Sequence, residues 1–209
     1  MELLNASKEP VTLFVAGTHT NGAGALRLDP SIATQLAAVY VTGGALYVPG
    51  NIAPVWPTVQ NYVAERNIWV DAQAAAEVWA AGLPMHLTPL DATDQIIWTV
   101  EDAARWEASG TPEGRVAAEV LRDQQCCFRD IYPDGVIMWD LVTAVHATHP
   151  ELFQQENVCI EIVTEPGPEQ GRTRVVPDGR PNTTACLVPR TEEIKLDVTE
   201  VLGLPRSTG

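Results

Sequence analysis

The chain has 209 residues, of which 45% are hydrophobic and 19% charged, a composition typical of a folded protein with room for one substantial core. Its formal charge is −14, and its 13 Lys and Arg residues form no basic run, so neither nucleic acid nor an anionic membrane is the expected partner. No apolar stretch approaches the roughly 20 residues that span a bilayer, and no signal-peptide pattern is seen, which favours a cytoplasmic location.

Four cysteines provide no recognisable metal or redox motif. Cys126 and Cys127 are adjacent and cannot easily bridge each other, and Cys159 and Cys186 stand alone. No C-x-x-C spacing is present. The sequence therefore predicts four buried thiols in a reducing compartment.

The first half of the chain alternates predicted strands with polar loops. Residues 11–16 and 37–41 are short apolar, β-branched runs typical of strands that are buried on both faces. A small polar loop follows the first strand at residues 17–22. A long Pro-containing loop follows the second and extends from Gly43 to about Val70.

Helices dominate the middle of the chain. Asp71 is a plausible N-cap for a helix over residues 72–81, and residues 85–88 form another strand. Thr99 begins a capping box, and Thr111 precedes a helix expected to reach about Phe128. A further helix is expected to begin near Asp140.

The last quarter has a different pattern. Residues 158–163 and 173–176 suggest a hairpin, followed by a strand at 184–188 and an amphipathic segment at 192–202. The fold class is therefore α/β, with an open, mainly parallel sheet flanked by helices and a short antiparallel annex. Residues 1–209 are expected to form a single domain. Residues 3–7 resemble the last turn of a helix, so the N-terminus looks cut and the first strands look absent.

Polar residues that follow the predicted strands are the first candidates for chemistry, since ligands gather at the carboxyl ends of parallel strands. Each also has a structural explanation. Asn51 is typical of a turn, Glu65 of a surface ion pair, and Trp139 of a core, while Asp140 suits a helix N-cap. The four histidines have no metal-ligand spacing and are interpreted as structural.

A series of short motifs occurs in order along the chain. It comprises residues 16–21 (AGTHTN), 41–45 (VTGGA), 50–54 (GNIAP), 64–68 (AERNI), 71–75 (DAQAA), 89–93 (PLDAT) and 139–141 (WDL). Together these resemble the inosine-uridine preferring nucleoside hydrolase family from about residue 11 to about residue 153. The resemblance implies that the chain is the C-terminal two-thirds of such a domain and has a Rossmann-like fold.

That family hydrolyses the N-glycosidic bond of ribonucleosides to free base and ribose through a calcium-bound water. By resemblance Thr20 supplies a backbone carbonyl and Asp140 a carboxylate to Ca²⁺, an ion that prefers oxygen ligands. Asn51, Glu65 and Asn67 are implied to bind the ribose, and Glu65 also to stabilise the oxocarbenium-like transition state.

Trp139 occupies a position where many family members have a histidine. A Trp-Asp pair resembles the purine-specific inosine-adenosine-guanosine branch, in which the purine stacks between aromatic rings and its protonation on departure is favoured. The resemblance therefore implies that Trp139 binds the base and assists catalysis, with a purine nucleoside as substrate. It leaves both a homodimer and a homotetramer open.

The departures from the family pattern lead to a second expectation. The Asp-rich segment that supplies most calcium carboxylates has no counterpart in this sequence, Thr42 replaces a common Met, and His19 replaces an apolar residue. We therefore expect the chain alone to lack hydrolase activity. Two alternatives from other classes are a non-catalytic remnant that binds a nucleoside or a partner chain, and a sugar-binding module with coincidental loops.

Overall fold

The structure is a computed structural model that describes residues 2–204, and it groups them into two compact units. Unit 1 contains residues up to Ala92 together with Gln154–Val188. Unit 2 contains Thr93–Phe153 and the segment that follows Val188. The expectation of a single domain stays a prediction.

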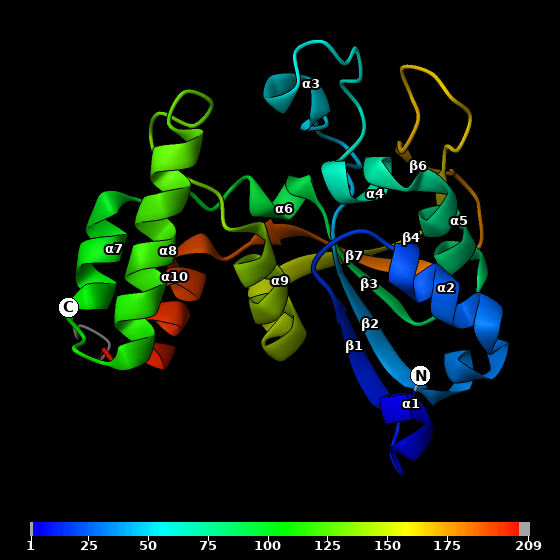
Figure 1. The fold of residues 1–209 in the computed structure, drawn as a ribbon, viewed down its shortest axis with the longest axis horizontal. Coiled ribbons are helices and arrows are strands. Elements are labelled where there is room, and N and C mark those ends of the chain that lie inside the picture. The colour runs from blue at the N-terminus through cyan, green and yellow to red at the C-terminus, as the bar shows by residue number, and fades with distance from the viewer. Residues whose placement is uncertain (1, 205–209) are drawn as a thin grey trace. The chain divides into compact units, whose positions relative to one another are not determined.

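Unit 1 is built on a largely parallel sheet (Figure 1). In residues 2–204 the five strands of this sheet have the order β1-β2-β3-β7-β4, and β1–β2, β2–β3 and β3–β7 pair in parallel. The bounds are β1 Val11–Val15, β2 Leu36–Thr42, β3 Met85–Thr88, β4 Phe153–Val158 and β7 Thr183–Pro189. The predicted α/β class with a mainly parallel sheet is confirmed.

A two-stranded antiparallel sheet forms the annex expected from the sequence. It pairs β5 (Ile160–Ile162) with β6 (Thr173–Val175). The further strand expected at residues 184–188 is β7, which lies beside β3 in the main sheet.

Helices of unit 1 supply the apolar core that covers the sheet. Helix α2 (Thr20–Leu28) and helix α5 (Ala72–Ala80) contribute small and branched side chains to one buried cluster with β2, β3 and β5. Asp71 caps α5 as predicted, because its carboxylate accepts a hydrogen bond from the Ala74 amide at 3.1 Å. The remaining helical segments of this unit are α1 Glu2–Ala6, η1 Pro30–Gln35, α3 Ile52–Val55, α4 Arg66–Val70 and α6 Leu90–Thr93.

Strand β1 differs from the expectation that both of its faces are buried. Its burial alternates along the strand, and the Phe14 side chain is 41% exposed. β1 lies at one end of the strand order, so it has a sheet neighbour on one side only within the described chain. A central strand such as β2 has the buried pattern that the sequence suggested for both.

Unit 2 is helical. Helices α7 (Val100–Glu107) and α8 (Pro112–Phe128) pack against each other, and Lys195 of α10 (Thr191–Val201) bonds Asp102 of α7 at 3.1 Å. Helix α9 (Trp139–Thr148) and the short η2 (Pro150–Leu152) complete the unit. The predicted capping box at Thr99 is present. No described helix is long and apolar enough to cross a membrane.

The cysteines are less buried than expected. Cys126 and Cys127 are exposed on α8 and Cys159 is partly buried, so Cys186 is the one fully buried thiol among them. Helix α8 presents a broad solvent face, on which Val116 is also exposed. Burial raises the pKa of the Cys186 thiol to about 12, which keeps it protonated.

Candidate functional site

The long loop after β2 is less irregular than predicted, because it contains the two short helices α3 and α4. Asn51 stands at the N-terminus of α3 and Glu65 at the N-terminus of α4. The Asn51 Oδ1 atom accepts a hydrogen bond from the Arg66 amide at 3.0 Å, which ties the start of one helix to the start of the other. Three residues predicted from the sequence, Asn51, Glu65 and Asn67, are thereby brought together.

Glu65 is the most unusual of the three because its carboxyl group is buried. The residue is 5% exposed, and its Oε2 atom accepts hydrogen bonds from the amides of Asn67, Gly44 and Ile68 at 2.9–3.2 Å. Burial raises the pKa of Glu65 to about 7, although these amides and the nearby Arg66 charge favour the ionised form. Both protonation states of Glu65 are therefore populated near neutral pH.

The polar atoms not used within unit 1 form a complementary set. Asn67 donates from Nδ2 to the Thr42 carbonyl at 3.0 Å, while Asn51 accepts through Oδ1. Within residues 2–204, Asn51 Nδ2, Asn67 Oδ1 and Glu65 Oε1 have no hydrogen-bond partner. Three polar atoms can therefore still form hydrogen bonds with a ligand: one amide donor, one amide acceptor and one carboxyl oxygen. This set matches the alternating donors and acceptors of a polyol.

Glycines allow the backbone to approach these residues closely. A Cβ atom at Gly50 would lie 2.1 Å from the Ala64 carbonyl oxygen, and one at Gly43 would lie 2.9 Å from Glu65 Oε2. Gly44 has a φ of +84°, a left-handed conformation that favours glycine. The Gly-rich sequence after β2 is therefore explained by the space around Glu65 and Asn51.

Thr20 and its neighbour lie at the start of α2 in the same unit. The Thr20 hydroxyl donates to Asp71 Oδ2 at 2.6 Å, and that bond is the largest cause lowering the pKa of Asp71. His19 is buried against the edge of the Trp79 ring, with centroids 5.2 Å apart, and burial lowers its pKa to about 4. A neutral, packed His19 agrees with its interpretation as structural.

Trp139 and Asp140 belong to unit 2. Trp139 is the first residue of α9, and its ring lies edge-on to Phe128 and Tyr132, with centroids 6.2 and 6.1 Å away. Within the described chain its Nε1 atom is buried and has no partner. Asp140 is exposed in the first turn of α9. The alternative that it is the N-cap is wrong, because Met138 holds that position.

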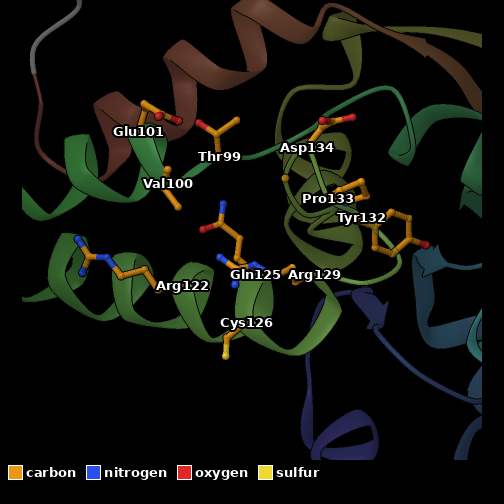
Figure 2. Close-up of a pocket in the computed structure, with 11 residues that line it drawn as sticks. Thr99, Val100, Glu101, Arg122, Gln125, Cys126, Arg129, Tyr132, Pro133 and Asp134 are labelled. Atoms are coloured by element: carbon orange, nitrogen blue, oxygen red, sulfur yellow. The ribbon is translucent and has the colours of Figure 1, made fainter.

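A cavity of about 370 Å³ lies beside this aromatic cluster in unit 2 (Figure 2). Thr99, Arg122, Gln125 and Tyr132 line it, and the figure shows the Gln125 side chain extending from α8 toward Thr99. None of the residues predicted to bind substrate lines this cavity. We therefore place the candidate ribose-binding residues in unit 1 and leave this cavity outside the candidate site.

Asp91 and Thr173 hold the loop after β2, although neither is among the site residues predicted from the sequence. Asp91 accepts hydrogen bonds from the amides of Leu46 and Tyr47, both at 2.8 Å, and Thr173 bonds both the amide and the carbonyl of Ala45. Both side chains are buried. Asp91 belongs to the motif at residues 89–93, whereas Thr173 lies in the short strand β6, where no sequence pattern indicates a role.

Comparison with known proteins identifies the family. The model of the family described as inosine-uridine preferring nucleoside hydrolase matches residues 1–198. The chain belongs to this family. The resemblance read from the motifs is thus confirmed at the family level, and the purine branch within it stays a prediction.

Two relatives with the same name show how far the similarity extends. A pyrimidine-specific ribonucleoside hydrolase RihA from Klebsiella pneumoniae is 32% identical over 196 residues, covering 88% of this chain and 58% of its own length. RihA of an Escherichia coli strain (O1:K1 / APEC) is 31% identical over 194 residues with the same coverage. This chain therefore spans a little more than half the length of these relatives.

Solved structures give the same fold. An inosine-uridine preferring nucleoside hydrolase from Bacillus anthracis is 27% identical with a TM-score of 0.78, over 97% of this chain and 62% of that protein. A purine-preferring ribonucleoside hydrolase from Gardnerella vaginalis has a TM-score of 0.85 at 22% identity, over 97% of this chain and 63% of that protein. The second likeness supports the fold alone.

The described residues do not provide a complete set of ligands for the calcium ion that the family implies. Calcium takes about six to eight oxygen ligands in proteins. In residues 2–204, no group of three or more His, Cys, Asp or Glu side chains comes together as a metal site. Thr20 and Asp140 lie in different units. The described residues do not by themselves fit the ion.

Proposed function

We propose that this chain supplies the ribose-binding residues and a base-binding aromatic cluster of a ribonucleoside hydrolase, which cleaves the N-glycosidic bond to give free base and ribose. Membership of the family supports the reaction class. The observation that carries the proposal is the buried Glu65 carboxyl group flanked by the unpaired Asn51 Nδ2 and Asn67 Oδ1 atoms. Within the described residues none of these atoms is a buried atom without a partner, so solvent, or a polar ligand in its place, can reach them.

In this proposal Asn51, Glu65 and Asn67 bind ribose hydroxyls. The Asn51 amide donates, the Asn67 carbonyl accepts, and Glu65 does either because its pKa is about 7. As the bond to the base breaks, the ribose acquires positive charge, and an ionised Glu65 stabilises it in a poorly hydrated setting. The three residues thus hold the sugar and favour the charged transition state.

Base recognition is proposed separately for unit 2. Trp139, with Phe128 and Tyr132 around it, offers aromatic surface on which a base stacks, and this supports a purine. A pyrimidine is the second candidate, because the RihA relatives at 31–32% identity bear the name pyrimidine-specific. A competition experiment with inosine and uridine distinguishes the purine from the pyrimidine candidate, because the preferred nucleoside displaces the other.

The first test measures binding and turnover together. Saturation-transfer NMR with inosine and with uridine is expected to show binding that is lost in Asn51→Ala and in Asn67→Ala. Asn157→Ala, which alters an exposed asparagine of β4, is the matched control and is expected to bind normally. Equal binding by all four proteins, or by none, would contradict the proposed ribose contacts.

Turnover is measured in the same samples with added calcium. We expect no release of base, since the described residues hold no complete calcium site. Release of hypoxanthine or uracil would overturn the expected inactivity and establish the chain itself as an enzyme.

The alternative is a non-catalytic remnant. The affinity of the chain for a cationic iminoribitol, compared with its affinity for a nucleoside, distinguishes such a remnant from a site shaped for catalysis. A site shaped for the transition state binds such a cation more tightly than the nucleoside, because the cation mimics the charged sugar. A remnant that has lost this complementarity binds the two alike. Tighter binding of the iminoribitol, weakened by Glu65→Gln, is the result expected here.

A further inference from the structure

The loop that follows β2 is fixed through its backbone amides. Gly43 N–H donates to the Thr88 carbonyl at 3.2 Å, and the next four amides are all bound by side chains. Gly44 donates to Glu65, Ala45 to Thr173, and Leu46 and Tyr47 to Asp91, at 2.8–3.2 Å. A loop with two glycines in left-handed or nearly extended conformations has little rigidity of its own. These side chains therefore determine its conformation.

Thr173 makes the closest connection to this loop. It is 1% exposed on β6, and its Oγ1 atom both accepts from the Ala45 amide at 2.9 Å and donates to the Ala45 carbonyl at 2.8 Å. Its methyl group lies beside Gly44, since a Cβ atom there would be 3.2 Å from Thr173 Cγ2. One side chain thus holds both polar groups of Ala45 and limits movement of Gly44.

Gly44 connects Ala45 to Glu65 through a hydrogen bond. Its amide is one of the three donors to Glu65 Oε2, and the other two, from Asn67 and Ile68, belong to the first turn of α4. The α4 amides move with Glu65 itself because they are only two and three residues away. Gly44 is the donor that orients the carboxyl group from a different segment of the fold.

We propose that Thr173 is a positioning residue for Glu65, which acts by holding Ala45 so that the Gly44 amide stays bonded to the Glu65 carboxyl group. The functional meaning of this inference rests on the proposed role of Glu65 in binding ribose. The positioning itself depends only on contacts within unit 1. None of the motifs in the series contains Thr173. The inference therefore adds a residue of the β5–β6 annex to the proposed ribose-binding site.

The test compares Thr173→Val with Thr173→Ser. Valine has nearly the same shape but cannot make either hydrogen bond to Ala45, whereas serine keeps the hydroxyl. Protein labelled with ¹³C at glutamate carboxyl carbons gives the titration of Glu65 directly by NMR. In Thr173→Val the pKa of Glu65 is expected to rise above its wild-type value, because the ionised carboxylate loses a fixed N–H donor. Thr173→Ser is expected to restore the wild-type titration.

Nucleoside affinity provides a second readout. Loss of one orienting hydrogen bond is expected to weaken inosine or uridine binding about two- to tenfold in Thr173→Val. A purely structural threonine would lower stability without moving the Glu65 titration. If no protein binds nucleoside, the proposed function fails, while the Glu65 titration still decides the positioning role.

An unchanged Glu65 titration in folded Thr173→Val would overturn the inference. If that variant does not fold, the wild-type protein decides the matter. In a pH titration of the wild-type protein, we then expect one common midpoint. It should be shared by the Glu65 carboxyl carbon, the amide resonances of Gly44 and Ala45, and the signals of Thr173. A titration seen at Gly44 but absent at Ala45 and Thr173 would show that the restraint does not reach Glu65.

Discussion

Glu65 is a buried acid whose charge opposes folding. Its folded pKa of about 7 lies above the ordinary value of 4.5, so the native state binds a proton more tightly than the unfolded chain. The stabilisation is fully present below pH 4.5 and is lost as pH rises through about 7. Over that range Glu65 contributes a change on the order of 3 kcal/mol in the free energy of unfolding.

Glu65→Gln tests this directly. The variant cannot ionise, so its free energy of unfolding relative to wild type is expected to increase by about 3 kcal/mol between pH of about 5 and about 8. Urea unfolding of both proteins at several pH values measures the difference. Glu119→Gln, which alters an exposed residue of α8, controls for the removal of one negative charge. Parallel pH profiles for wild type and Glu65→Gln would show that Glu65 is not buried as described.

Individual side chains were predicted unevenly from the sequence. Asn51, Glu65 and Asn67 were found because their motifs occur in a fixed order, and Asp71 because helix caps are local signals. The burial of Glu65 was not predicted, since an acid in a polar loop looks solvated. Thr173 was missed because its partner is 128 residues away. Local pattern carries no information about such a pair.

At the scale of elements, the long helices and the strands β1, β2, β3, β5, β6 and β7 agree with the sequence pattern, whereas strand β4 is not expected from it. The small helices α3 and α4 are not expected either, because four or five residues show no periodicity and depend on contacts such as that between Asn51 and the Arg66 amide. The loop–helix arrangement also requires close backbone approach at Gly50. Its amide donates to Tyr62 O at 2.8 Å, and the next amide donates to Ala64 O at 3.1 Å.

Gly50→Ala is expected to disturb this arrangement. A Cβ atom there would collide with the Ala64 backbone, so the variant should lose roughly 1–3 kcal/mol of stability and bind nucleoside less well as Asn51 shifts. Gly24→Ala is the matched control, since a Cβ atom at Gly24 on α2 meets nothing within 4 Å. That change should be neutral or stabilising by about 1 kcal/mol, as alanine favours helix. Equal stabilities of the two variants in urea unfolding would contradict the close approach.

At the scale of the whole molecule, the described residues form two compact units, and the predicted site residues are divided between them. No sequence feature predicts this division, because there is no linker and no change of composition at Ala92. Physical grouping depends on which distant segments pack together, and here residues 154–188 return to the first unit. The purine preference, the assembly state and the roles of Thr20 and Asp140 stay predictions.

Calcium affinity is a property of the whole chain that can be measured. A complete site with a Kd of about 10 µM would raise the free energy of unfolding by about 2.7 kcal/mol at about 1 mM calcium. We expect no such increase, because no cluster of three or more His, Cys, Asp or Glu side chains occurs in the described chain. Thermal or urea unfolding with calcium, and with magnesium as control, provides the measurement. A calcium-specific stabilisation of this size would reveal a site that these residues do not account for.

The bond between Ala45 and Thr173 also has a consequence for synthesis of the protein. These residues are 128 positions apart, and ribosomes add about 5 to 20 residues per second, so Thr173 is made roughly 6 to 26 seconds after Ala45. During that interval the amide and carbonyl of Ala45 lack the side chain that binds them in the finished fold. The nascent loop can gain the Thr173 contacts of its final shape only when the β5–β6 hairpin has emerged, so the Gly44 amide near Glu65 acquires this restraint late in synthesis.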